Sequence, residues 1–188
     1  QILKGFEITD SISDGLLKID GKITGTGLKE VTKTNILIEN FGVKDAPLFT
    51  QILNATSLVG LVNTLRGKGI RFQTLRADVD FTPNKIEIKN SFASGTSLGV
   101  STEGAIDRNS DQISIKGMIV PAYILNRIID QIPVVGRILT GGKKEGLLAA
   151  EYLISGTRDE PEVSVNPLTA FTPGFLRAFV KATRKPLE

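Results

Sequence analysis

One stretch of the sequence has the spacing of a serine nucleophile. Gly95, Ser97 and Gly99 fit the pattern G-x-S-x-G, in which a base deprotonates the serine and the serine attacks an acyl group. That base is usually a histidine, and the chain has none. The pattern also requires a strand that turns into a helix, whereas another strand pattern follows here. We therefore interpret this stretch as a glycine- and serine-rich start of a strand.

A second stretch shares some features with a phosphate-binding loop. Gly136 and Gly141 have the glycine spacing of that loop, which then requires a lysine followed by a hydroxyl residue. Lys143 comes one position late, and Lys144 follows it in place of the hydroxyl. We interpret this segment as a glycine-ended helix and its loop.

Acidic side chains alternate along the strands that we predict, at Asp78, Asp80, Glu87 and Asp107. Two facing carboxylates serve as acid and base in glycoside hydrolysis, but the same alternation is typical of a solvated sheet face, the interpretation we favour. Asp159, Glu160 and Glu162 cluster around Pro161 and could bind Ca²⁺ weakly, although their spacing is not that of a known calcium loop.

The chain lacks both histidine and cysteine. It therefore has neither the commonest general base nor an imidazole or thiolate metal ligand. We expect a protein that is not an enzyme and needs no cofactor or metal. The formal net charge of +3 is concentrated after Pro173, with no basic stripe of interleaved aromatic residues, so we expect no nucleic-acid partner.

The bulk composition is that of a folded chain. Its 188 residues, 40% apolar and 23% charged, fit a single domain with a core of Ile, Leu and Val. The chain begins at Gln1 and its only methionine is Met118, which favours a segment of a longer protein. No apolar run reaches roughly 18 residues, so we expect any membrane anchor outside this segment.

Residues 1–45 are expected to form strands, over Ile2–Thr9, Leu16–Ile23 and Val31–Val43. In the second of these segments apolar residues alternate with Lys18, Asp20 and Lys22, which is the pattern of a sheet with one apolar face.

Residues 46–69 are expected to form a helical insertion. Asp45 is its predicted N-cap, Pro47 lies in its first turn and Gly67 ends it. A break near Thr56 divides the insertion into two short helices.

Residues 70–120 carry the clearest strand pattern. Strands about ten residues apart, with turns at Pro83–Asn84 and Arg108–Ser110, predict an antiparallel meander. The apolar parity changes between Phe72 and Leu75, which predicts a β-bulge near Gln73.

Residues 121–142 are expected to form a second helical insertion that starts at Pro121. Residues 143–188 are expected to add a strand over Leu147–Ser155, another over Pro161–Val165, and an amphipathic helix from Pro173 to about Thr183.

The chain is thus expected to be one segment, residues 1–188, of mainly β structure with α insertions. We predict a long, twisted antiparallel sheet curled into an open groove, plus two helical insertions and a C-terminal amphipathic helix. The candidates for lining the groove are apolar residues of the central strands: Ile70, Phe72, Ile86, Ile88, Leu98, Val100, Ile113 and Ile115. The terminal helix suits contact with a membrane surface through Phe175, Leu176, Arg177, Phe179 and Lys181, with capping of the sheet as the alternative.

Three motifs in the second half of the chain resemble a known family. They cover Val120–Asn126, then Ile132–Gly141 with Glu145–Leu147, then Val165–Leu168 with Thr172–Arg177. Their order and spacing are similar to those of the C-terminal region of the AsmA-like, YhdP-type family of bridge-like lipid-transport proteins.

The resemblance implies a component of the Gram-negative cell envelope. It implies a periplasmic segment, tethered to the inner membrane by sequence outside this chain, with phospholipid carried between the inner and outer membranes along an apolar β-groove. The alternative is a structural spacer, or a docking platform for other envelope proteins, whose groove is filled by its own side chains.

Overall fold

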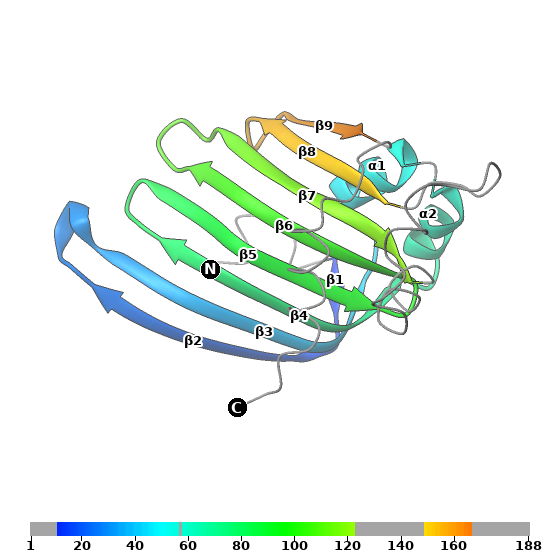
Figure 1. The fold of residues 1–188 in the computed structure, drawn as a ribbon, viewed down its shortest axis with the longest axis horizontal. Coiled ribbons are helices and arrows are strands. Elements are labelled where there is room, and N and C mark those ends of the chain that lie inside the picture. Colours follow the sequence, from blue (N-terminus) through cyan, green and yellow to red (C-terminus); the bar gives the residue numbers. More distant parts are fainter. Residues whose placement is uncertain (1–10, 57, 123–148, 167–188) are drawn as a thin grey trace, which may run out of the picture.

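The computed structural model describes residues 11–56, 58–122 and 149–166 (Figure 1). These residues form one nine-stranded antiparallel sheet and two helices, α1 (Pro47–Ala55) and α2 (Val59–Arg66). The strands are β1 (Ile12–Ser13), β2 (Leu16–Thr24), β3 (Val31–Val43), β4 (Ile70–Phe81), β5 (Lys85–Gly95), β6 (Leu98–Asp107), β7 (Ile113–Pro121), β8 (Ala150–Gly156) and β9 (Pro161–Asn166). The expectation of a mainly β fold with an open antiparallel sheet is confirmed.

Strands that follow one another along the chain are neighbours in the sheet. From β3 to β9 each strand pairs antiparallel with the next, so the predicted meander is confirmed. β1 and β2 both pair with β3, β1 at Gly42 and Val43 and β2 along the preceding residues. The sheet is twisted and does not close on itself (Figure 1), so β2 and β9 are the outer strands of the described part.

The turns between strands use residues that tolerate a left-handed backbone. Asp14 and Gly15, between β1 and β2, have φ values of 61° and 93°. After β6, the carboxylate of Asp107 accepts the backbone N–H groups of Ser110 at 2.8 Å and Asn109 at 2.9 Å. These bonds stabilise the charged form and hold the pKa of Asp107 below its ordinary value.

The sheet is irregular where the sequence predicted a bulge. The pairing of β4 with β5 shifts by one residue between Phe72 and Thr74, which confirms the expected bulge near Gln73. Asn40 in β3 has a φ of 56° close to the same place. Together these distortions let Phe41 and Phe72 join the side of the sheet that carries Ile38 in the hydrophobic core.

The helical insertion is divided as expected, but its start differs. α1 ends at Ala55 and α2 begins at Val59, with Pro47 in the first turn of α1. The N-cap is Ala46, without a side-chain hydrogen bond, so the prediction of Asp45 as the cap was wrong. Asp45 has a φ of 51°, a left-handed conformation that an N-cap does not adopt.

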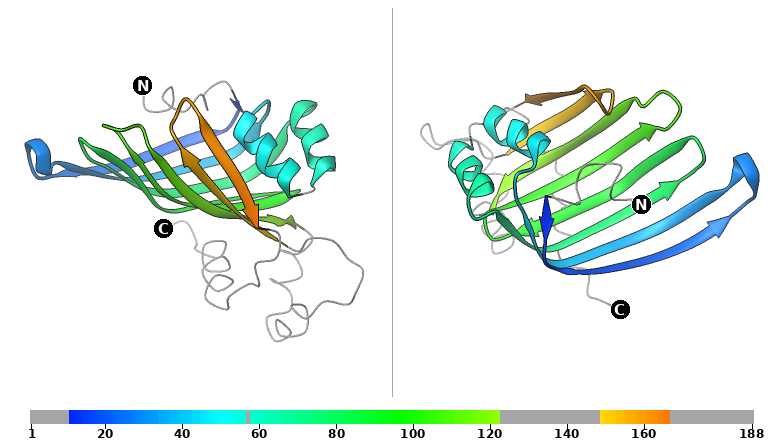
Figure 2. Two further views of the ribbon diagram at one scale, coloured as in Figure 1. Left: turned by 90° about the horizontal axis from the view of Figure 1, so that it is seen from above. Right: turned by 180° about the vertical axis from the view of Figure 1, so that it is seen from behind.

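Both helices lie on the same side of the sheet, near one end of the strands (Figure 2). Their buried residues Ile52, Leu53 and Leu65 join Phe41 and Phe72 in a single hydrophobic core. The rings of Phe41 and Phe72 stack with centroids 5.2 Å apart, and Phe49 of α1 lies 6.4 Å from Phe72. These contacts anchor the helices to β3 and β4.

The second half of the chain follows the prediction in part. Pro121 is the last residue of β7 and pairs with Leu98, and the helical conformation begins at Ala122, one residue later than predicted. β8 starts at Ala150, three residues later than the expected start at Leu147, and β9 is found where a strand was expected. Residues 123–142 of the second helical insertion, the strand over Ile2–Thr9 and the C-terminal helix lie outside the described residues.

Candidate functional site

Residues that pair across neighbouring strands fall into four rows that cross the sheet. One row runs from Ile23 through Thr32, Phe81, Ile86 and Ile106 to Ile113. The next is Gly21, Thr34, Val79, Ile88, Gly104, Ile115, Ile154 and Val163. The third is Ile19, Ile36, Ala77, Ser91, Thr102, Gly117, Tyr152 and Val165, and the fourth is Leu17, Ile38, Leu75, Ala93, Val100, Ile119 and Ala150. We call these four rows the apolar face, because none of their residues carries a charge.

The charged residues of β2 to β9 all lie outside the apolar face. Directly paired residues project to the same side of a sheet, and successive residues of a strand project to opposite sides. The residues between the rows therefore form a second surface, the polar face, which carries Lys18, Asp20, Lys22, Lys33, Arg76, Asp78, Asp80, Glu87, Glu103, Lys116, Glu151 and Glu162. The charged side chains are thus confined to one face over the full width of the described strands, and that face also carries apolar residues such as Leu16 and Leu153.

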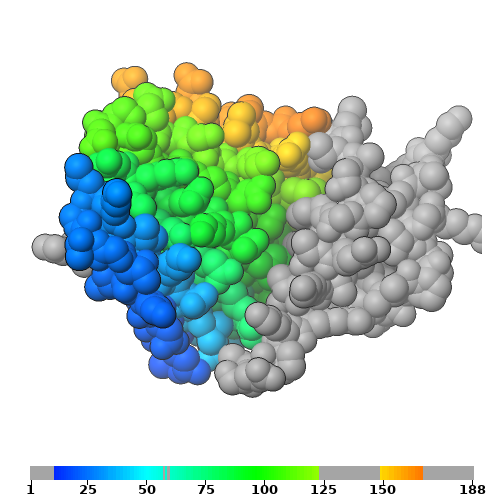
Figure 3. Space-filling model, turned by 60° about the vertical axis from the view of Figure 1, so that its left-hand side comes forward, coloured from blue at the N-terminus to red at the C-terminus, as the bar shows by residue number. Residues whose placement is uncertain are grey.

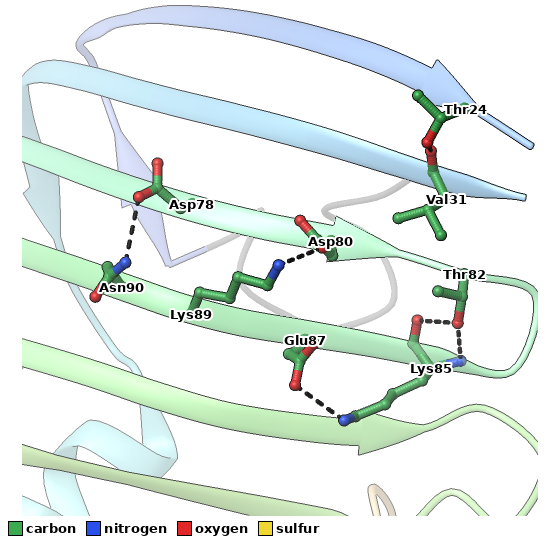
Figure 4. A network of polar contacts seen from close by, with 9 residues as sticks. All are labelled: Thr24, Val31, Asp78, Asp80, Thr82, Lys85, Glu87, Lys89 and Asn90. Carbon is green, nitrogen blue, oxygen red and sulfur yellow. Dashed lines mark hydrogen bonds and ion pairs between the residues drawn. The ribbon is translucent and has the colours of Figure 1, made fainter.

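Two acidic residues of the polar face, Asp78 and Asp80, are held by neighbouring side chains (Figure 4). Asp78 accepts hydrogen bonds from the side-chain amides of Asn35 at 2.7 Å and Asn90 at 3.4 Å. Asp80 pairs with Lys89 at 2.5 Å, and this bond raises the pKa of the Lys89 ammonium. These contacts form a polar network along the sheet, in agreement with the interpretation of the alternating acids as a solvated face.

The eight predicted groove residues lie in two regions of the sheet. Ile86, Ile88, Val100, Ile113 and Ile115 lie in the apolar face, whereas Ile70, Phe72 and Leu98 lie beyond it at the end that carries the helices. Ile70, Phe72, Leu98, Ile113 and Ile115 are buried in the core, and only Ile86, Ile88 and Val100 are half-buried. Burial by α1, through Phe49 against Phe72, removes part of the predicted lining from contact with any ligand.

The most accessible part of the apolar face was not among the predicted lining residues. Leu17, Ile19 and Ile23 of β2 are 43%, 55% and 65% exposed. Their alternation with charged residues was the signal in the sequence, because it placed them on the apolar side of a strand. The alternation does not reveal that β2 lies at the margin of the sheet, where a strand has a neighbour on one side only and its side chains stay exposed.

Two polar side chains in the apolar face, Tyr152 and Thr102, are neutral and hydrogen-bonded. Tyr152 is 3% exposed, and its hydroxyl lies 2.7 Å from the hydroxyl of Thr102 and donates a hydrogen bond to the backbone carbonyl oxygen of Ser101 at 2.8 Å. Burial raises the pKa of Tyr152 to about 12. The side chain is therefore uncharged at neutral pH, and the face keeps its apolar character.

Two stretches that suggested a nucleophile or a calcium site lie at turns between antiparallel strands. Gly95 ends β5 and Gly99 lies in β6, so Ser97 stands in a turn between two antiparallel strands, not between a strand and a helix. The acidic cluster around Pro161 lies at the turn from β8 to β9, where Arg158 pairs with Asp111. Within residues 11–56, 58–122 and 149–166, no three Asp, Glu, His or Cys side chains gather in a way that could hold a metal ion.

Two further predictions concern membranes. None of the helices described in the structure is long and apolar enough to cross a bilayer. The residues predicted to touch a membrane surface, Phe175, Leu176, Arg177, Phe179 and Lys181, lie outside the described residues.

No family model, curated protein or solved structure matches this chain. Of the three motifs that carry the resemblance to AsmA-like proteins, the described residues include only the first and third in part. Val120 is buried in β7, and Val165 lies in the apolar face in β9.

Proposed function

We propose that this chain is a non-enzymatic periplasmic segment of a cell-envelope protein that carries phospholipid between the inner and outer membranes. In this proposal the lipid tails lie against the apolar face, and the sheet curls around them as an open groove. The observation that carries the proposal is the separation of charge: four uncharged rows cross the strands, while every charged side chain of β2 to β9 lies outside them.

The size of the apolar face suits an acyl chain. Neighbouring strands lie about 4.8 Å apart, so a row that crosses eight strands is roughly 34 Å long. One leaflet of a bilayer has a hydrocarbon thickness of about 15 Å, half of the ~30 Å core. A row is therefore long enough for an acyl chain to move along it without leaving apolar contact.

The energetics favour a covered route of this kind. Removing apolar surface from water is worth about 0.8 kcal/mol for each CH₂ group, so a sixteen-carbon chain gains on the order of 10 kcal/mol. A lipid that crosses an aqueous compartment loses this amount unless apolar surface accompanies it. Such a mechanism needs a continuous surface and neither a nucleophile nor a cofactor.

Within the apolar face, we assign lipid contact to its half-buried and exposed residues. These are Ile86, Ile88 and Val100 in the centre and Leu17, Ile19 and Ile23 at the margin. Ile70, Phe72 and Leu98 instead pack in the core with the helices, which close the face at one end. The resemblance to AsmA-like proteins adds a tether to the inner membrane outside this chain, and a membrane contact at the C-terminal helix.

Native mass spectrometry with lipid identification tests the proposal. β2 offers a matched pair of substitutions, because Leu16 and Leu17 are both exposed but project to opposite faces. We expect phospholipid bound to the purified chain, reduced by Leu17→Asp and retained by Leu16→Asp. Equal lipid in the two variants, with both folded by circular dichroism, rules out the apolar face as the binding surface.

A structural spacer or docking platform is the second candidate. It is favoured by the burial of five of the eight predicted lining residues, because the fold fills that part of the predicted groove with its own side chains. A folded protein that carries no lipid, and takes none up from phospholipid vesicles, would support this function in place of lipid carriage.

A further inference from the structure

Strand β2 is an outer strand with all nine of its residues exposed. It pairs with β3 alone, in an uninterrupted register from Leu16 opposite Glu39 to Thr24 opposite Val31. The backbone groups on its other side have no strand partner within the described part of the chain. In the space-filling view the β2–β3 hairpin, in blue, forms one margin of the molecule (Figure 3).

Such a strand is normally protected against pairing with another chain. Proline, a bulge, a very short length, charged side chains on the edge or a charge pointing toward the core are the usual means. β9, at the other margin, is six residues long, starts with Pro161 and contacts α1. β2 has no proline and no bulge, is nine residues long, and carries its charges, Lys18, Asp20 and Lys22, on the polar face. Because these charges are of both signs, a second copy in the right register can pair with them.

We propose that β2 pairs antiparallel with β2 of a second copy of this chain, about a two-fold axis at Gly21. In this register Asp20 of each copy lies opposite Lys22 of the other, and Ile19 lies opposite Ile23. Opposite charges and apolar pairs that face each other across strands both stabilise a sheet. A shift of the axis by one residue, to Asp20, places Asp20 against Asp20 and Lys18 against Lys22, so the charge pattern selects the register.

The side chains that this register uses are available. Asp20 and Lys22 make no ion pair with another described residue, whereas Lys18 is already paired with Glu39 at 3.3 Å. The two-fold axis of an antiparallel strand pair is perpendicular to the sheet, so the apolar faces of both copies lie on the same side. The pairing brings Ile19 of one copy beside Ile23 of the other, two of the most exposed large apolar residues, on a shared apolar face, and extends the sheet without a break.

Charge exchange tests the register by sedimentation equilibrium over a range of concentrations. Lys22→Glu turns two attractive pairs per dimer into two repulsive pairs, and we expect a roughly tenfold rise in the dimer dissociation constant. The double variant Asp20→Lys with Lys22→Glu restores the attraction and returns the constant to that of the natural sequence. Lys68→Glu is the matched control, since this exposed residue changes the charge equally away from β2.

A disulfide provides an independent readout. The chain contains no cysteine, and a Cβ at Gly21 would lie 3.6 Å from the nearest atoms, the carbonyl oxygen of Lys33 and Oγ1 of Thr34, which is ordinary contact. Gly21→Cys places two thiols across the axis, where paired Cα atoms lie about 5 Å apart, within the range of a disulfide. Ile19→Cys is the control, because residue 19 in the two copies is about 13 Å apart in this register.

The outcomes separate this proposal from its competitors. A cross-linked dimer of Gly21→Cys but not of Ile19→Cys, with restoration by the double charge variant, supports it. A chain that stays monomeric at all concentrations overturns it, as does a dimer that Lys22→Glu leaves unchanged. Lipid binding does not enter these measurements, so the proposed function can fail while this pairing stands.

Discussion

The hydroxyl of Tyr152 in β8 donates a hydrogen bond to the backbone carbonyl oxygen of Ser101 in β6, 2.8 Å away, across the strand that separates them. The side chain passes over Gly117 of β7, its direct neighbour in the pairing. A Cβ on Gly117 would clash with both the Ser101 carbonyl and the Tyr152 hydroxyl. The glycine and the tyrosine therefore form one unit that joins three strands.

Gly117→Ala is expected to lower the free energy of unfolding by about 3 kcal/mol, because the added methyl group overpacks this contact. Urea denaturation measures the change. Gly60→Ala is the control, since nothing lies within 4 Å of a Cβ at that glycine. If the Gly117→Ala protein is as stable as the natural one, Gly117 does not lie in close contact with the Ser101 carbonyl and the Tyr152 hydroxyl.

Tyr152→Phe is expected to remove a pH dependence of stability above pH 10. The pKa of the buried hydroxyl is raised from an ordinary value of 10.0 to about 12, so the folded state keeps a proton that the unfolded state loses. The stabilisation is complete below pH 10 and is lost as the pH rises toward 12. The free energy of unfolding, measured by urea denaturation between pH 8 and 11, should fall more steeply with pH for the natural sequence than for Tyr152→Phe. An equal pH dependence in the two proteins would contradict this prediction.

Asp107→Asn is expected to weaken the loss of stability at acidic pH. The N–H donors of Ser110 and Asn109 lower the pKa of the Asp107 carboxyl below 3.8, so its contribution is present above that pH and is lost as the pH falls through the lowered value. The free energy of unfolding, measured from pH 6 down to pH 2.5, should decline less for Asp107→Asn than for the natural sequence. Asp159→Asn serves as the comparison, because the side chain of Asp159 is exposed and makes no hydrogen bond or ion pair with a described residue. Equal curves for both variants would contradict the role of the turn.

Val100→Asp is expected to reduce phospholipid transfer between vesicles more than Val100→Ala does. A shortened side chain leaves the apolar face continuous, whereas a carboxylate interrupts it with a group that is costly to remove from water. Ser114→Asp, on the polar face of the adjacent β7, is the control. Equal losses for both Val100 variants, with folding intact, would contradict a lipid route across the sheet.

The same substitution at Ile115 is less informative than the sequence alone suggested. Ile115 is 8% exposed within the core, so Ile115→Asp buries a charge and is expected to destabilise the fold by several kcal/mol. A loss of transfer in that variant would report unfolding. Val100, which is half-buried, separates the two effects.

The sequence by itself determined the local elements of this protein. Alternation of apolar and charged residues located β2 to β7 closely, and the change of parity after Phe72 located the bulge. Proline and glycine placed the start and end of the helical insertion, and the gap near Thr56 divided it. These features depend on backbone preferences and on a side-chain period that a few neighbouring residues express, so they can be read along the chain.

The tertiary structure alone decided which of these residues meet. The N-cap prediction at Asp45 failed because Asp45 adopts a left-handed backbone conformation, which the preference for a capping side chain does not reveal. The burial of Phe72 depends on the approach of Phe49 from a helix, and the exposure of Ile19 depends on β2 lying at the margin of the sheet. Pairing between strands distant in sequence fixes these outcomes, because the same alternating pattern fits a central strand and an outer strand equally well.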